Sequence, residues 1–209
     1  MPAGGCGPEE TVGDAVARRV EARRGRASVW AEAMRELGAV DRAVYEAVAR
    51  TPTADLDGPV RRLSESANYS RLWLAIAASL AVFGGDRGRR AALEGVVSIA
   101  VTSATVNLGL KSIHRRRRPD RVESDGLPSR HVPMPESTSF PSGHAASAFA
   151  FAYAVGRHLP ALAVPLRLLA AGVAYSRVHT GVHYPGDVVV GSVVGAGTAA
   201  AVAAVGDRL

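Results

Sequence analysis

The pattern of apolar and polar residues changes character near residue 70. Before that point, residues 28–50 carry apolar side chains at three- and four-residue steps, namely Trp30, Met34, Leu37, Val40, Val44 and Val48. This spacing predicts an amphipathic helix that begins at a Ser28 N-cap. The apolar stripe fits either a helix packed on its own domain or a helix lying in a membrane interface.

Five apolar segments follow, and they predict an all-α protein embedded in a membrane. They cover residues 72–84, 91–110, 145–156, 159–175 and 187–205. Several are shorter than the roughly 20 residues that span a bilayer as a helix. Even so, five such segments in a chain of 209 residues are hard to bury in a soluble fold. The last segment is rich in Gly and Ala, which favours close helix packing in lipid. A soluble all-α bundle is the alternative.

Composition divides the chain into three regions. Residues 1–27 are polar and rich in Arg, Glu and Gly, so we expect a flexible tail. They lack the apolar core of a secretory signal. Residues 28–70 form the amphipathic helical region, and residues 71–206 form a transmembrane domain of about five helices.

Polar side chains that carry chemistry gather in two links between the apolar segments. Residues 111–144 open with KSIHRRRRPDR and close with SFPSGH, and residues 176–187 read SRVHTGVHYPGD. In a bundle whose helices alternate in direction, both links emerge at the same end. We therefore expect one site there, with the candidates Lys111, Arg118, Ser142, Gly143, His144, Arg177, His183 and Asp187.

The cations at this end favour an anion with several oxygens. The net charge is +6, yet Lys111 is the only lysine among 25 basic residues, so generic positive charge does not explain its position. Arginine forks and a lysine point charge suit phosphate. Ser142 and Gly143 precede an apolar helix, whose free N-terminal amides can cradle an anion. We interpret the arginines at 115–117 as surface or lipid-headgroup contacts.

His183 and Asp187 predict a covalent catalytic pair. Asp187 is the sole carboxylate between residues 137 and 206, and it can orient the ring so that Nδ1–H faces the carboxylate and Nε2 faces phosphorus. His144 then serves as general acid and base. Two alternatives stay open. One is a purely structural His–Asp pair, and the other is a metal site on His179, His183 and Asp187, which the surrounding cations disfavour.

The same residues resemble the type 2 phosphatidic acid phosphatase family, which shares its site with vanadium haloperoxidases and some bacterial acid phosphatases. The three family motifs stand here as KSIHRRRRP, PSGH and SRVHTGVHYPGD. The match covers about residues 72–205. It implies an α-helical phosphatase with His183 as nucleophile, Asp187 as its orienter and His144 as acid and base. It also implies no metal or other cofactor, and phosphate ligands drawn from Lys111, Arg118, Ser142, Gly143 and Arg177.

Membrane spans combined with a phosphate site imply a polyprenyl or glycerolipid phosphate as substrate and the bilayer as partner, without nucleic acid. Compact members of the family rich in Arg and Ala look like actinobacterial enzymes acting on polyprenyl phosphates, including decaprenylphosphoryl phosphoribose. A homo-oligomer stays open. The competing hypotheses are transfer of the phosphoryl group to an acceptor alcohol, a vanadate-dependent haloperoxidase, and a non-catalytic binder of anionic lipid or nucleic acid.

The orientation in the membrane follows from the N-terminus and the charges. A polar N-terminal region without a signal would stay in the cytoplasm, and five spans would then place the catalytic face on the cytoplasmic side of the cell membrane. Arginines are also richer on that face.

Overall fold

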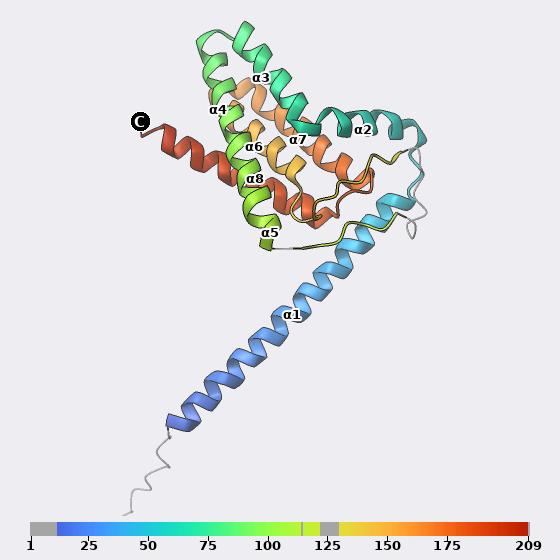
Figure 1. Cartoon of the computed structure of the whole chain (residues 1–209), viewed down its shortest axis with the longest axis vertical. Coiled ribbons are helices and arrows are strands. Elements are labelled where there is room, and N and C mark those ends of the chain that lie inside the picture. Colours follow the sequence, from blue (N-terminus) through green and yellow to red (C-terminus); the bar gives the residue numbers. More distant parts are fainter. Residues whose placement is uncertain (1–11, 114, 122–129, 209) are drawn as a thin grey trace, which may run out of the picture. The chain divides into compact units, whose positions relative to one another are not determined.

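Helices account for every regular element in the part of the chain that the computed structural model describes, residues 12–113, 115–121 and 130–208 (Figure 1). The predicted all-α class is therefore confirmed for these residues. The elements are α1 (Val12–Arg50), α2 (Ala54–Ser66), the 3₁₀ turn η1 (Asn68–Ser70), α3 (Arg71–Phe83), α4 (Gly85–Ala104), the π-helix η2 (Thr105–Leu110), α5 (Lys111–Ile113), α6 (Gly143–His158), α7 (Pro160–His179) and α8 (Pro185–Gly206).

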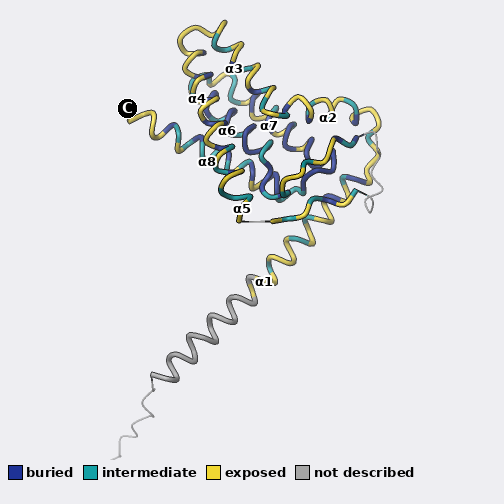
Figure 2. The backbone as a smooth tube through the Cα atoms, viewed as in Figure 1, coloured by how far each residue is buried: buried dark blue, intermediate teal, exposed yellow. Residues whose placement is uncertain are grey.

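Helix α6 forms the centre of the bundle and packs against α4, α7 and α8 (Figures 1 and 2). Its alanine side chains are small enough to allow this close approach, and most of them are completely buried. On α8, a Cβ at Gly195 would lie 2.0 Å from the Ala146 carbonyl oxygen, and one at Gly191 would lie 2.5 Å from that of Ser142. Glycine is thus required where α8 crosses the N-terminal half of α6.

A second part of the core lies between α3, α4 and α6. Trp73 and Phe151 are buried with their ring centroids 5.4 Å apart. A Cβ at Gly95 would lie 2.8 Å from the Phe151 ring, so α4 uses a glycine to admit this ring. These contacts hold α3 on the bundle although it is only 13 residues long.

Among the described residues, three helices are long and apolar enough to cross a membrane. They are Gly85–Ile113, Pro160–His179 and Pro185–Gly206. These helices correspond to the predicted segments 91–110, 159–175 and 187–205. The other two segments correspond to α3 and α6, of 13 and 16 residues, so the count of five spans stays a prediction. Exposed apolar side chains on α3, α4, α7 and α8, including Phe83, Val101, Leu168 and Val193, are typical of a surface that contacts lipid.

The N-terminal region differs from the sequence expectation. Helix α1 begins at Val12, so residues 12–27 are helical where composition indicated a flexible tail; Ala and Arg, frequent there, are strong helix formers. Residues 1–11 lie outside the described residues. The compact units of the chain are Met1–Val40 and Asp41–Leu209.

Within the second unit, the apolar stripe of α1 is packed only in part, because Val48 packs against the buried cluster that contains Tyr45 and Ala49. Val44 is 44% exposed, whereas Tyr45 and Ala49 are buried against α6, α7 and α8. Met34 and Leu37, in the first unit, are also exposed.

A buried polar cluster joins α2 to the end of α7 and to the loop before α6. Asp57 accepts a hydrogen bond from His179 Nε2 at 3.0 Å and pairs with Arg130 Nε at 3.2 Å. Arg130 also donates to carbonyl oxygens at the C-terminus of α1, those of Val48, Ala49 and Thr51. These bonds satisfy orphan carbonyls at the C-terminus of α1 and join this end of the helix to α2.

Candidate active site

The two polar links meet at one end of the bundle, as the alternating helix directions predict. Lys111, Arg118, Gly143, His144 and His183 line one cavity of about 190 Å³. The remaining predicted site residues, Ser142, Arg177 and Asp187, are buried beside them. All eight candidates therefore gather in one place.

The local fold explains how each link delivers its residues. At the end of α4, η2 is a π-helix, an irregularity frequent at functional sites. It leads to Lys111, and both Asn107 and Lys111 line the cavity. Ser142 is the N-cap of α6, with its hydroxyl 3.5 Å from the Ala145 amide. The amide of Gly143 is thus among those without a partner inside the helix.

The link between α7 and α8 is a tight turn that carries His183. The amides of Val182 and His183 both donate to the Arg177 carbonyl at 3.1 Å. Gly181 has φ of +70°, a conformation that favours glycine. Asp187 then lies in the first turn of α8, where its carboxylate accepts from the Tyr184 amide at 3.0 Å and caps the helix.

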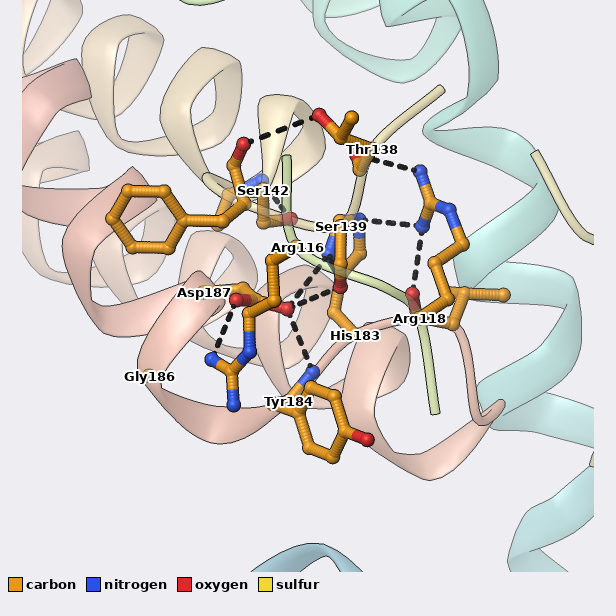
Figure 3. A network of polar contacts seen from close by, with 12 residues as sticks. Arg116, Arg118, Thr138, Ser139, Ser142, His183, Tyr184, Gly186 and Asp187 are labelled. Carbon is orange, nitrogen blue, oxygen red and sulfur yellow. Dashed lines mark hydrogen bonds and ion pairs between the residues drawn. The ribbon is translucent and has the colours of Figure 1, made fainter. Parts of the chain in front are cut away.

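His183 is buried between a carboxylate and a cation (Figure 3). Its Nδ1 lies 3.5 Å from Asp187 Oδ2 and 3.4 Å from Ser139 Oγ, and the Ser139 hydroxyl itself donates to Asp187 Oδ2. On the other side of the ring, Nε2 lies 3.3 Å from Arg118 NH1. A guanidinium can only donate, so this contact requires a lone pair on Nε2 and places the proton on Nδ1.

Burial lowers the pKa of His183 to about 4. The charges of Arg118 and Arg177 lower this pKa as well, whereas the hydrogen bond and the charge of Asp187 raise it. His183 is therefore neutral at physiological pH and keeps the lone pair that a nucleophile needs.

Arg116 has a different role from the surface contact that the sequence indicated. Its NH1 donates to Asp187 Oδ1 at 2.9 Å (Figure 3). Its NH2 lies 2.6 Å from Asp41 Oδ2 in α1. The run of four arginines gave no reason to single out this one. Only the fold shows that Arg116 turns inward, while its neighbours Arg115 and Arg117 are exposed.

Arg118 and Lys111 are held by the loop that precedes α6. Arg118 donates to the carbonyl oxygens of Ser137 at 2.9 Å and Val182 at 2.7 Å. Lys111 Nζ donates to Ser137 Oγ at 3.2 Å, and so does Arg118 NH2 at the same distance. Ser137 thereby keeps the two cations near each other and beside His183.

Arg177 is almost completely buried, and only part of its guanidinium is satisfied. NH1 donates to Ser64 Oγ at 2.6 Å, whereas Nε has no hydrogen-bond partner among the described residues. A buried cation of this kind is costly unless an anion pairs with it. Together with Lys111 and Arg118, it makes this end of the bundle suited to a multiply charged anion.

His144 lies in the first turn of α6 with its Nε2 2.9 Å from the side-chain oxygen of Asn68 in η1. Burial strongly lowers its pKa, and the nearby charges of Arg177, His183, Lys111 and Arg118 lower it further. Two residues after Asn68, Ser70 has φ of +59°, and Tyr69 has φ of +54°. Both line the cavity, and left-handed non-glycine residues often mark functional sites. No sequence pattern pointed to Asn68.

The metal alternative does not match the arrangement of the residues. His179 Nε2 bonds to Asp57, whereas His183 faces Asp187 and Ser139. Among the described residues, no group of three or more His, Cys, Asp or Glu side chains converges as metal ligands would. The candidate site is thus a set of cations, two histidines and one carboxylate around a cavity.

Comparison with known proteins agrees with this geometry. The sequence profile described as the PAP2 superfamily matches residues 91–209. A decaprenylphosphoryl-5-phosphoribose phosphatase of Mycobacterium tuberculosis is 38% identical over 147 residues, which cover 70% of this chain and 78% of that protein. The protein of the same name from Mycolicibacterium smegmatis is 36% identical over 135 residues, covering 63% and 68%.

Two solved structures share the fold. LpxE from Aquifex aeolicus superposes with a TM-score of 0.64 at 22% identity, covering 77% of this chain and 92% of that one. A transmembrane PAP2-type phosphatidylglycerolphosphate phosphatase from Bacillus subtilis gives a TM-score of 0.63 at 24% identity, covering 83% and 88%.

Proposed function

This chain belongs to the PAP2 superfamily, and from that premise we propose that it is a metal-independent membrane lipid phosphatase acting through a phosphohistidine at His183. The single observation that carries the mechanism is the orientation of His183. Nδ1 faces Asp187 and Ser139, and Nε2 has its lone pair beside Arg118. A phosphoric ester hydrolase is the activity that the family and the named relatives support.

The first step forms a covalent bond to phosphorus. The substrate phosphate would be held by Lys111, Arg118 and Arg177 and by the free amide of Gly143 at the start of α6. Nε2 of His183 donates its lone pair to phosphorus, and the bond between phosphorus and the leaving oxygen breaks. Asp187 stabilises the positive charge that develops on the ring.

His144 would supply the proton that the leaving oxygen needs. Neighbouring cations and burial keep His144 neutral without substrate, but a bound phosphate brings negative charge that raises the pKa of this imidazole again. After the lipid alcohol leaves, His144 takes a proton from water, water attacks phosphorus, and the bond to Nε2 breaks. Inorganic phosphate leaves and both histidines return to their starting state.

We propose a polyprenyl phosphate as the substrate class, with a phosphorylated sugar carried on the lipid. The support is the 38% identity to a phosphatase named for decaprenylphosphoryl-5-phosphoribose. The cavity is also lined by the uncharged polar side chains of Ser103, Asn107 and Ser147, next to the cations. Such groups suit the hydroxyls of a sugar better than they suit an acyl glycerol.

The catalytic end would face the cytoplasm. Arginines gather there, at positions 115–118 and 121, as expected for the cytoplasmic ends of membrane helices. Labelling of single cysteines placed at Arg115 and at Asp86, in a variant without Cys6, tests this orientation in intact cells. Only the cysteine at position 86 should react with an impermeant reagent, and the reverse result would place the site outside.

Phosphate release in detergent with EDTA tests the proposed activity. The panel contains a polyprenyl phosphoribose phosphate, polyprenyl mono- and diphosphates, phosphatidic acid and phosphatidylglycerol phosphate. We expect release to survive EDTA, to favour the sugar-bearing lipid, and to vanish in His183→Ala. His158→Ala is the matched control, because His158 bonds to Glu94 and does not line the cavity. Loss of activity in EDTA would contradict the mechanism, and preference for a glycerolipid would contradict the substrate class.

A further inference from the structure

An ion-pair chain runs from α1 through the arginine loop to the carboxylate beside His183. Arg116 donates to Asp187 Oδ1 at 2.9 Å and contacts Asp41 Oδ2 at 2.6 Å, while its guanidinium lies 4.2 Å from the centre of the Tyr184 ring. The Arg116 side chain is 29% exposed, that of Asp41 is 11% exposed, and that of Asp187 is fully buried. Solvent therefore screens these contacts only weakly.

Asp41 also holds the backbone next to the catalytic pair. Its Oδ1 accepts a hydrogen bond from the Gly186 amide at 2.6 Å. Gly186 immediately precedes Asp187 in the first turn of α8. A Cβ at Gly186 would lie 3.0 Å from the Asp41 carboxylate, so a side chain there would disturb this contact.

The contacts of Asp187 divide between its two oxygens. Oδ2 faces the catalytic side, where it meets His183 Nδ1, the Ser139 hydroxyl and the Tyr184 amide. Oδ1 is bound by Arg116. Arg116 thus fixes the rotation of the carboxylate so that Oδ2 stays directed at the ring.

The charge balance explains why a second carboxylate is needed. Without Asp41, the positive charge of Arg116 would offset the negative charge of Asp187 at the His183 ring. Arg118 already adds positive charge on the other side of this ring. Asp41 neutralises Arg116 from the far side. The net charge of the chain Asp41, Arg116 and Asp187 is then minus one, which leaves Asp187 able to stabilise a cationic ring.

We propose that Asp41 and Arg116 are positioning residues for phosphoryl transfer, which act through Asp187 and make α1 a part of the catalytic machinery. This inference rests on the proposed role of His183 as nucleophile. Asp41 lies outside residues 91–209, the part matched by the family profile. The N-terminal helix would therefore supply a contact that the matched region alone lacks.

Steady-state kinetics of the full-length protein test the proposal with Arg116→Gln, Arg116→Lys and Asp41→Asn. The matched controls are Arg117→Gln, an exposed neighbour in the same run, and Asp55→Asn, an exposed acid in α2. Each variant is also combined with Asp187→Asn. Thermal unfolding in detergent checks that every variant is folded at the assay temperature.

We expect Arg116→Gln to lower kcat by roughly 10- to 100-fold, the loss typical of residues that orient a catalytic ligand, and to leave KM unchanged. Asp41→Asn should lower kcat in the same way but less, and Arg116→Lys should recover part of the activity. In the Asp187→Asn background, neither Arg116→Gln nor Asp41→Asn should reduce kcat further, because both act through the same carboxylate.

Two results would overturn the proposal. One is a kcat in folded Arg116→Gln and Asp41→Asn equal to that of the controls. The other is an undiminished effect of these substitutions in the Asp187→Asn background. The parent protein separates this failure from that of the proposed function. If the parent forms a phosphohistidine that His183→Ala abolishes, the nucleophile stands and only the positioning role is lost.

Discussion

At the scale of single residues, the protonation state of His183 would determine whether the proposed attack on phosphorus can begin. Its pKa is lowered to about 4, first by burial and then by Arg118 and Arg177. A depressed histidine pKa means that the neutral, nucleophilic form persists as the pH falls through 6.5 and is lost only near 4. The site should therefore stay competent in mildly acidic conditions.

Nitrogen NMR of ¹⁵N-histidine-labelled protein in detergent measures this directly, with the His183 signals assigned from their absence in His183→Gln. We expect a titration midpoint far below 6.5, with Nδ1 carrying the proton of the neutral ring. Arg118→Gln should move the midpoint upward, because it removes a cation that disfavours protonation. A midpoint at or above 6.5 in the parent protein would contradict the described environment.

That the eight candidate residues lie together could be predicted from the sequence, because both polar links emerge at the same end of a bundle whose helices alternate in direction. Once both links lie at one end of the bundle, few chemical roles fit a set of three cations, two histidines and one carboxylate. Asn68, Ser139 and Arg116 could not be found in this way. Each of them contacts a residue that is distant in the sequence and comes close only in the folded chain. Arg116 also lies in a run of four arginines.

At the scale of helices, the active site depends on how closely α8 approaches α6. The Ser142 amide donates to the Asp187 carbonyl at 2.9 Å, which ties the beginnings of the two helices together. One turn further along, Gly191 leaves no room for a side chain beside the Ser142 carbonyl. Packing of small residues thus positions the Asp187 carboxylate relative to the start of α6.

Gly195→Ala tests this packing, with Gly197→Ala as the matched control on the same helix. A Cβ at Gly195 would lie 2.0 Å from the Ala146 carbonyl oxygen, whereas nothing lies within 4 Å of one at Gly197. We expect Gly195→Ala to destabilise the bundle by about 1–3 kcal/mol or more, as overpacking does. Thermal unfolding in detergent should show a lower midpoint for Gly195→Ala alone, and equal midpoints would contradict the described crossing.

The buried cluster of Asp57, His179 and Arg130 gives a second prediction at this scale. Asp57→Asn would leave the Arg130 guanidinium, which is 1% exposed, without its carboxylate. Removing one partner of a buried pair costs about 3–5 kcal/mol. Unfolding should occur at lower temperature in Asp57→Asn but not in Asp55→Asn, an exposed acid in the same helix. An unchanged midpoint in Asp57→Asn would show that the cluster does not hold α2.

The apolar runs of the sequence predict the positions of the helices well, but they predict the helix ends less well. The segments at 72–84 and 159–175 differ from α3 and α7 by a few residues. The start of α1 was not predictable from apolar periodicity, because its first turns are polar. The π-helix at Thr105–Leu110 was not predictable either. An additional residue in one helical turn does not change the pattern of a continuous apolar run.

At the scale of the whole molecule, the protein combines a bundle of apolar helices with a cluster of cations at one end. Three helices could cross a membrane, and exposed apolar side chains surround the bundle. The cations, by contrast, lie where helices α4, α6, α7 and α8 begin or end. This arrangement would let a lipid chain remain among apolar side chains while its phosphate reaches His183.

The central claim is that His183 becomes phosphorylated during turnover. The most direct measurement is mass spectrometry of protein quenched in alkali during reaction with an aryl phosphate, in the presence of EDTA. His144→Ala should accumulate the intermediate, because a good leaving group needs no acid while hydrolysis still needs a base. We predict one phosphate on His183 and none in His183→Ala. Phosphate release without a modified residue 183, or turnover by His183→Ala, would contradict the account.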